Sequence, residues 1–310
     1  MKVELVGGFL GVGKTTLIKG LIEHWSGREK LAVLVNEFGE VGIDGTLLAG
    51  RGTEVVELAS GCICCTLNAD LKAQVSDIAL TYQPEHLLIE PTGIATTKSI
   101  LNILGSLSLE KFITAIRVTL LLDGLSYGSD SRLFSFIDSQ IALADLVVLN
   151  KSDLVLPQVI SEIRHRVASI NPQAKIIQAK YGREAIEAMV NDDREPVDVK
   201  TMPNANEDDT ILFTDYQSLG VTWQGVVTQE RLLKLFDKFK DRDLGEIMRA
   251  KGFFLTDEDR WIVLDFVQGQ IYQEWSEGKS YSESRLTVIG KELRRDLIDT
   301  AIEACRLIEG

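Results

Sequence analysis

Residues 8–15 of this chain are G-F-L-G-V-G-K-T, and this octapeptide constrains the fold more than any other segment. It matches the pattern G-x-x-x-x-G-K-[ST] and lies between a short apolar run, expected to be a buried strand, and an expected helix. Glycines let successive backbone N–H groups surround a phosphate, and the N-terminus of the following helix adds partial positive charge. The octapeptide therefore predicts a nucleotide phosphate site, with a ligand-free glycine-rich turn as the alternative.

The residues of this loop have separable expected roles. Lys14 is expected to reach the β- and γ-phosphates, and the Thr15 hydroxyl is expected to ligate Mg²⁺. The nucleotide-contacting residues expected here are Gly8, Gly11, Val12, Gly13, Lys14, Thr15 and Thr16.

The first 190 residues alternate short apolar runs with longer segments of helical period. This rhythm predicts an α/β fold, a P-loop domain with a doubly wound, mostly parallel sheet that has helices on both faces. Strands are expected at 3–6, 32–36, 87–90, 116–123, 145–150 and 175–178, and helices at 14–24, 67–80 and 158–170.

A second, smaller domain is expected after an acidic segment. Residues 191–210 contain seven acidic residues, two basic residues and two prolines, which predicts a solvated linker. Residues 211–310 then combine strand-like and amphipathic helical runs, so the expected domains are 1–190, a linker at 191–210, and an α+β domain at 211–310. Its expected strands are 211–213, 261–266 and 285–289, and its expected helices are 229–239 and 291–308.

The tetrapeptide Asn150-Lys151-Ser152-Asp153 follows an expected strand and matches N-K-x-D. A carboxylate at Asp153 can accept hydrogen bonds from guanine N1–H and the 2-amino group, a pair of donors that adenine lacks. The Lys151 stem can lie over the base, and Asn150 can tie the loop to nearby backbone. GTP and GDP are therefore the expected nucleotides, with a solvated turn as the alternative; Ala179, after the next strand, is a candidate second base contact. A small-molecule kinase would share the phosphate loop without needing N-K-x-D.

Acidic residues end two further expected strands. Glu90 is placed to hold the magnesium shell, and Gly93 would let backbone approach the γ-phosphate. Lys14 and Glu90 are thus the expected catalytic residues, although residues 90–93 could instead cap the following helix. Asp123 is expected to be a structural turn acid, with an additional polar contact as the alternative.

Cys62, Cys64 and Cys65 form the most unusual cluster in the chain. Thiols at a helix N-terminus have lowered pKa values, which favours the thiolate that binds metal. Soft thiolates suit Zn²⁺, Cu(I) or iron–sulfur clusters, and Co²⁺ and Ni²⁺ are also open; Zn²⁺ is the expected ion. Three sulfurs leave a tetrahedral site one ligand short, which favours a transferable ion over a structural one. Redox-sensing or inert buried thiols are the alternatives, and Cys305 is expected to be ordinary core.

An acidic, glycine-rich loop at 35–45 lies where a nucleotide-dependent switch is expected. Glu37, Glu40 and Asp44 are candidates for the missing oxygen ligand, and Glu40 is the tentative choice. A solvated polar loop is the alternative.

The charge balance limits the classes of partner. Lys and Arg number 33 against 46 Asp and Glu, giving a net charge of −13, which argues against nucleic acid and membrane surfaces. No run approaches the ~20 apolar residues that a bilayer span needs, and no targeting signal is evident. Together with reduced thiols, this favours the cytoplasm.

The motifs GGFLGVGKTT, VNEFGEVGIDGTLL, GCICCTL, LLIEPTG and NKSDL occur in this order, and with them the chain resembles the CobW-like family of metal-associated P-loop GTPases. The resemblance implies GTP binding, slow hydrolysis, metal at the C-x-C-C cysteines, and delivery to a client metalloprotein or cofactor-biosynthesis enzyme. An alternative is a GTPase that activates a client as a conformational chaperone without transferring metal. Whether the protein forms a homodimer is left open by the sequence. Two departures are Thr96-Thr97, where the family often has Asp-Pro, and a linker without histidine, which argues against metal storage.

Overall fold

The computed structural model describes two compact units. The described residues are 1–9, 11–25, 27–35, 53–57, 67–91, 97–124, 131–180, 183–190, 216–267, 269–276 and 283–306. Several predictions fall outside these ranges: Cys62, Cys64, Cys65, Glu37, Glu40, Asp44, Gly93, the linker 191–210 and the strand 211–213.

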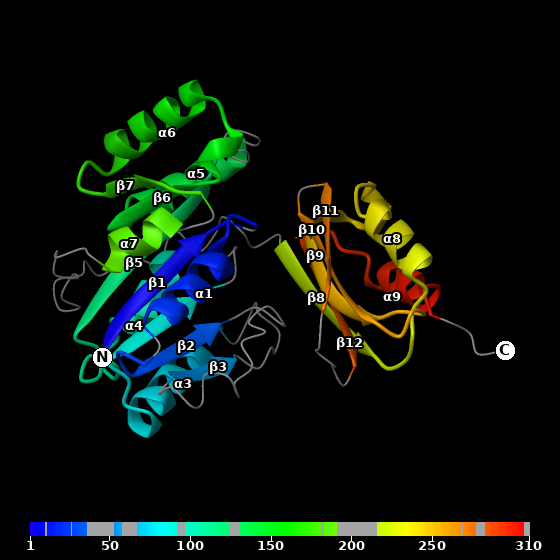
Figure 1. Ribbon diagram of the computed structural model, residues 1–310, viewed down its shortest axis with the longest axis horizontal. Helices are drawn as coiled ribbons and strands as arrows, with labels where there is room; N and C mark the ends of the chain where they lie inside the picture. Colours follow the sequence, from blue (N-terminus) through cyan, green and yellow to red (C-terminus); the bar gives the residue numbers. More distant parts are fainter. Residues whose placement is uncertain are drawn as a thin grey trace. The chain divides into compact units, whose positions relative to one another are not determined.

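The first unit is built on a parallel seven-stranded sheet in the order β3-β2-β4-β1-β5-β6-β7 (Figure 1). Parallel strands covered on both faces need nearly continuous apolar runs, and every residue of Leu146–Asn150 is buried. The strands are β1 Lys2–Gly8, β2 Leu31–Val35, β3 Thr53–Glu57, β4 His86–Glu90, β5 Ala115–Asp123, β6 Leu146–Asn150 and β7 Lys175–Gln178.

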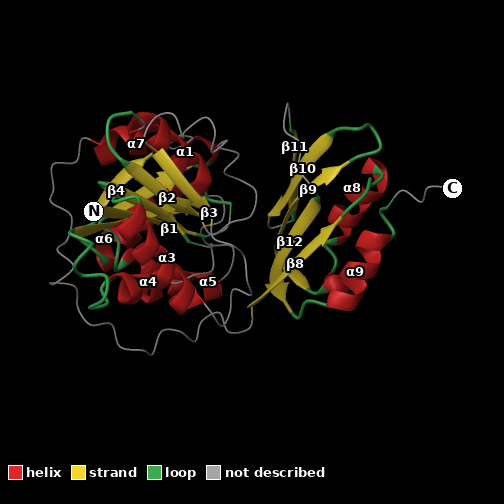
Figure 2. Cartoon of the chain, turned by 90° about the horizontal axis from the view of Figure 1, so that it is seen from below, coloured by secondary structure: helices red, strands yellow, loops and turns green. Residues whose placement is uncertain are grey.

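Helices cover both faces of this sheet, which confirms the doubly wound prediction. Figure 2 shows α1 and α7 on one face and α3, α4 and α5 on the other. None of the described helices is long and apolar enough to cross a membrane. The helices are α1 Lys14–Trp25, α3 Leu67–Thr81, α4 Thr97–Leu104, α5 Ser131–Ile141, α6 Pro157–Ile170 and α7 Arg183–Val190, with a short 3-10 helix η1 at Ser152–Leu154.

The strand order brings the phosphate loop and the polar ends of three other strands to the carboxyl end of the sheet. β1 lies between β4 and β5, and β6 pairs with β5. Because these strands are parallel, their carboxyl ends meet, so the loop after β1 lies beside Glu90, Asp123 and Asn150, which end β4, β5 and β6. The chain leaves β1 toward one side of the sheet and later crosses to the other, and such a branch point is where α/β sheets bind ligands.

The second unit is an antiparallel five-stranded sheet in the order β11-β10-β9-β12-β8, which confirms the predicted α+β class. Its two longer helices lie on one face of the sheet (Figure 2). The elements are β8 Tyr216–Trp223, α8 Gln229–Lys238, a 3-10 helix η4 at Arg242–Leu244, β9 Glu246–Leu255, β10 Trp261–Val267, β11 Gln270–Trp275, β12 Ser284–Lys291 and α9 Arg295–Glu303.

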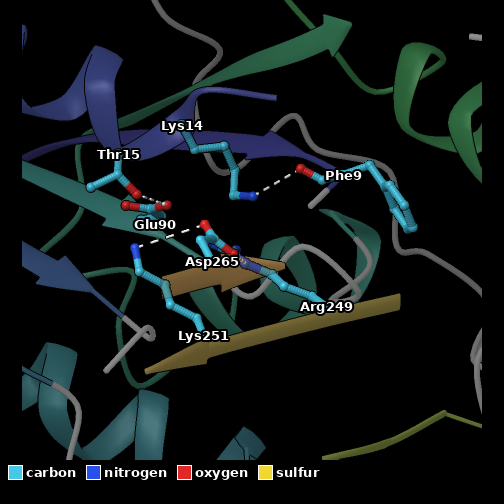
Figure 3. Close-up of polar contacts among 7 residues, drawn as sticks. All are labelled: Phe9, Lys14, Thr15, Glu90, Arg249, Lys251 and Asp265. Carbon is cyan, nitrogen blue, oxygen red and sulfur yellow. Dashed lines mark hydrogen bonds and ion pairs between the residues drawn. The ribbon is translucent and has the colours of Figure 1, made fainter. Parts of the chain in front are cut away.

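The two faces of this second sheet differ in chemistry. Phe236 of α8 packs with Phe254 and Phe266 in an apolar core between sheet and helices. On the opposite face Arg249 makes a bidentate ion pair with Asp265, at 3.1 and 3.0 Å, and Lys251 Nζ lies 4.0 Å from the same carboxylate (Figure 3). A strand that alternates core and polar positions produces this separation.

Cys305 is part of the apolar core of the second unit, as predicted. Burial raises the pKa of its thiol to about 11, against a small opposing effect of nearby cations. The thiol is therefore neutral at physiological pH, which disfavours the thiolate form that binds metals.

The secondary structure differs from the sequence-based expectation in several places: β3, β8, β9 and β11 were not among the expected strands, and the last helix begins later than expected. The sequence of β3, T-E-V-V-E, has no long apolar run; among the described strands it lies at the edge of the sheet and pairs with β2 alone. The helix expected to begin at residue 291 begins at Arg295 instead. Lys291 still pairs with Tyr216 on one side and Glu246 on the other, so β12 retains it.

Candidate nucleotide-binding site

The loop after β1 has the backbone that a phosphate-binding loop needs. Gly8, Gly11 and Gly13 have φ values of 140°, 74° and 101°, which residues with a Cβ rarely adopt. Space is also restricted, since a Cβ on Gly8 would lie 2.6 Å from the carbonyl oxygen of Leu121. The loop can therefore present its N–H groups only because glycines occupy these positions, and Leu10 lies outside the described residues.

Lys14 and Thr15 begin α1 immediately after this loop. The Lys14 side chain is buried, and its Nζ donates a hydrogen bond to the carbonyl oxygen of Phe9 at 3.1 Å (Figure 3). This contact holds the ammonium group over the loop, at the positive end of the helix dipole. Thr16, the next residue, is exposed.

Thr15 faces Glu90 across the ends of α1 and β4. Its hydroxyl donates to Glu90 Oε1 at 2.8 Å, and Glu90 is 1% exposed (Figure 3). Because the hydroxyl hydrogen points toward the carboxylate in this hydrogen bond, the lone pairs of its oxygen can face a cation. A carboxylate this deeply buried is stabilised by positive charge, and oxygen ligands suit Mg²⁺. The two residues fit a magnesium ion.

The N-K-x-D segment is joined directly to the phosphate loop. Asn150 Nδ2 donates to the carbonyl oxygen of Val12 at 2.9 Å. Asn150 Oδ1 is buried and has no hydrogen-bond partner among the described residues, so a nucleotide N–H could satisfy it. The base-recognition and phosphate-binding segments therefore form one site, which fits a nucleotide.

The base-recognition loop is also held from its other side. The Ser152 hydroxyl donates to the carbonyl oxygen of Ala179 at 3.1 Å, and the Ser152 N–H donates to the same oxygen at 3.3 Å. Asp153 follows within η1 and is exposed. Ala179 itself is buried, and the structure brings it to the N-K-x-D loop through its carbonyl group. The exposed Asp153 side chain therefore extends from a loop that Ser152 ties to the Ala179 carbonyl oxygen.

The structure gives Asp123 and Gln140 partners that the sequence did not indicate. Asp123 forms an ion pair with Lys151, whose Nζ lies 2.7 Å from Asp123 Oδ2. Gln140 of α5 is buried and accepts a hydrogen bond from the Thr97 hydroxyl at 3.3 Å, beside Gly7 of β1. No local pattern marks Gln140, since it meets Thr97 across 43 positions of sequence.

The expected transition-metal site is not part of the described structure. Cys62, Cys64, Cys65 and Glu40 all lie outside the described residues, as does Gly93. Within the ranges that the structure describes, no group of three or more His, Cys, Asp or Glu side chains could hold a metal ion.

Gly13→Ala is expected to lower the free energy of unfolding by about 2–3 kcal/mol, because it adds backbone strain and displaces Asn150. A Cβ at this position would lie 2.5 Å from Asn150 Nδ2. Gly27→Ala is the matched control, since Gly27 also has a positive φ, 77°, but nothing within 4 Å of the added Cβ. Urea unfolding should give a smaller loss for the control, about 1 kcal/mol. Equal losses would show that the contact with Asn150 is unimportant.

Two family models match the chain. The CobW/HypB/UreG nucleotide-binding domain matches residues 2–178, and the cobalamin synthesis protein cobW C-terminal domain matches residues 216–306. The zinc chaperone YeiR of Escherichia coli K12 is 38% identical over 189 residues, which cover 59% of this chain and 56% of YeiR. The zinc chaperone YjiA of the same organism is 26% identical over 324 residues, which cover 98% of each chain.

Among solved structures, the Zn(II)-bound YjiA GTPase from E. coli matches with a TM-score of 0.46 and 21% identity, over 99% of each chain. The chain spans less than two thirds of the length of three of its curated relatives, namely 56%, 59% and 57%. The first family model alone covers more than half of the residues. The chain therefore belongs to the CobW/HypB/UreG family.

Proposed function

We propose that the protein is a Mg²⁺-dependent GTPase that binds a transition metal ion and delivers it to a client metalloprotein or a cofactor-biosynthesis enzyme. The observation that carries the GTPase assignment is the hydrogen bond from Asn150 Nδ2 to the Val12 carbonyl oxygen. It joins a loop of the N-K-x-D type to a phosphate loop, and few sites other than guanine nucleotide sites need both.

Each part of the site has a proposed task. The loop glycines and the N–H groups of Thr15 and Thr16 surround the phosphates, while Lys14 neutralises charge on the β- and γ-phosphates. Thr15 and Glu90 hold Mg²⁺, which when bound supplies positive charge to the transferring phosphoryl group. Water attacks the γ-phosphorus, GDP leaves, and the proton of the water ends on the phosphate or the solvent.

The remaining contacts concern the γ-phosphate and the base. Gly93 brings backbone close to the γ-phosphate. Asp153 accepts two hydrogen bonds from guanine, Lys151 lies along the base, and the segment at Ala179 borders it. These contacts exclude adenine, which cannot satisfy a carboxylate at this place.

The metal is proposed to bind at Cys62, Cys64 and Cys65, with Glu40 as the tentative fourth ligand. Zn²⁺ is the preferred ion and Co²⁺ and Ni²⁺ are the alternatives, because thiolates suit all three. The curated names of YeiR and YjiA, both called zinc chaperones, support this order. GTP would order the loop that contains Glu40 and complete the site; hydrolysis would release it.

The domain boundaries and location complete the proposal. Residues 1–190 form the GTPase domain, 191–210 the acidic linker and 211–310 the C-terminal domain. Matches of the two family models at 2–178 and 216–306 support this division. We propose a cytoplasmic location, since neighbouring thiols stay reduced there.

One comparison tests the whole proposal. The affinity for Zn²⁺, Co²⁺ and Ni²⁺ is measured by competition with a chromophoric chelator, once with a non-hydrolysable GTP analogue and once with GDP. Coupling of about 1–3 kcal/mol would change metal affinity by roughly 5–150-fold between the two states. Equal affinities in both states would instead support a GTPase that activates its client without transferring metal.

Cys64→Ala is expected to abolish stoichiometric metal binding in the GTP-analogue state and to leave GDP affinity unchanged. Removing one of three thiolates deprives the site of a ligand that a neutral oxygen cannot replace for a soft ion. Cys305→Ala is the control, because the buried Cys305 thiol, with its pKa near 11, is not a ligand. Metal content equal to that of the wild type in Cys64→Ala would refute the assignment of the cysteine site.

A further inference from the structure

We propose that Asp123 is a positioning residue of the guanine pocket, which holds the Lys151 ammonium group so that the Lys151 stem forms one fixed wall of the base site. The inference rests on the proposed function, because the wall is defined by the guanine ring. Asp123 acts through Lys151 and touches neither base nor phosphate in this assignment.

The sheet brings the two residues together. Asp123 ends β5 and is the direct register partner of Asn150, which ends β6. Lys151 follows Asn150, and its Nζ lies 2.7 Å from Asp123 Oδ2. The Asp123 side chain is 7% exposed and the Lys151 side chain 30%. A carboxylate so shielded from water needs a cation, so the pair is more than a surface contact.

The backbone of Lys151 supports a fixed rather than a mobile side chain. Lys151 has φ 53° and ψ 32°, a left-handed conformation that residues with a Cβ rarely adopt. Such a conformation persists where the surroundings determine it. Here the ion pair with Asp123 holds the Lys151 side chain. The next residue, Ser152, is hydrogen-bonded to the carbonyl oxygen of Ala179.

Fixing the stem matters for nucleotide affinity. A free lysine side chain has many rotamers, and much of this conformational entropy is lost when the stem is ordered against a ligand. The ion pair orders the stem before the nucleotide binds, so this loss of side-chain entropy does not weaken nucleotide binding. The apolar part of the stem can then cover the face of the base while the charged end stays with Asp123.

The test is GDP binding by calorimetry to the wild type, Asp123→Asn, Lys151→Met and the double variant. Each single variant should bind GDP about tenfold more weakly, the effect of losing one charge-assisted contact. The double variant should be no weaker than either single variant, because both changes remove the same contact. The ratio of GDP to IDP affinity should stay at the wild-type value in Asp123→Asn, since Asp153, which recognises the 2-amino group, is untouched.

Asp138→Asn is the matched control. Asp138 of α5 is also ion-paired, with Arg166 of α6, and this pair lies in exposed surroundings. Its loss should leave GDP affinity unchanged. Asp123→Asn binding GDP as tightly as the wild type, or effects of the two single changes that add in full, would overturn the role of Asp123. A wild type that binds no guanine nucleotide would refute the proposed function itself, so the two failures are distinguishable.

Discussion

Lys14→Ala is expected to reduce kcat/KM for GTP hydrolysis by on the order of 10²–10³-fold. Negative charge builds up on the phosphate oxygens as the bond to the γ-phosphorus breaks, and a cation fixed in advance stabilises that charge most. The structure holds the cation ready, because Lys14 is buried and its Nζ is bound to the Phe9 carbonyl oxygen. Phosphate release at varied GTP concentration measures the loss.

Lys19→Ala is the control for this experiment. Lys19 lies on the same helix, α1, but its side chain is exposed. Removing the Lys19 ammonium group should change kcat/KM less than twofold, since solvent and salt largely screen an exposed charge. Urea unfolding of both variants separates lost chemistry from lost stability. A Lys14→Ala variant that hydrolyses GTP within threefold of the wild-type rate would refute the phosphate-binding role.

The features that sequence analysis predicted correctly are those that local chemistry determines. Glycine at positions 8 and 13 is required by backbone angles that other residues avoid, so the pattern itself carries the loop conformation. The strand ending at Asn150 is buried along its whole length, which matches its unbroken apolar sequence. Both signals lie within a few residues of the structure that they specify.

The features that it could not predict depend on strand order. Asp123 and Lys151 are 28 residues apart, and they meet only because β5 and β6 are neighbours in the sheet. Nothing near Asp123 in the sequence distinguishes a turn acid from the partner of a distant lysine. β3 was not predicted for a related reason: its place at the edge of the described sheet follows from strand order, and its sequence has no long apolar run.

Two hydrogen bonds tie the loop that contains Asp153 to its surroundings, so in the proposed function base selection depends on one side chain. Asn150 ties the loop to the Val12 carbonyl oxygen, and Ser152 ties it to Ala179. Asp153 itself is exposed. A substitution at this position therefore changes the hydrogen-bonding groups offered to the base while the loop remains in place.

Asp153→Asn is expected to invert the base preference from guanine to xanthine. The asparagine amide offers one acceptor and one donor, so its donor faces the 2-amino group of guanine, and two charge-assisted hydrogen bonds worth about 1.5–3 kcal/mol each are lost or weakened. GDP affinity should therefore fall by on the order of 10²–10⁴-fold. Xanthine has a carbonyl group at that position and accepts the donor, so XDP should bind more tightly than GDP. Equilibrium competition between GDP and XDP measures the inversion, with Glu162→Gln on the exposed side of α6 as the charge-matched control. A variant that still prefers GDP would mean that guanine is recognised elsewhere.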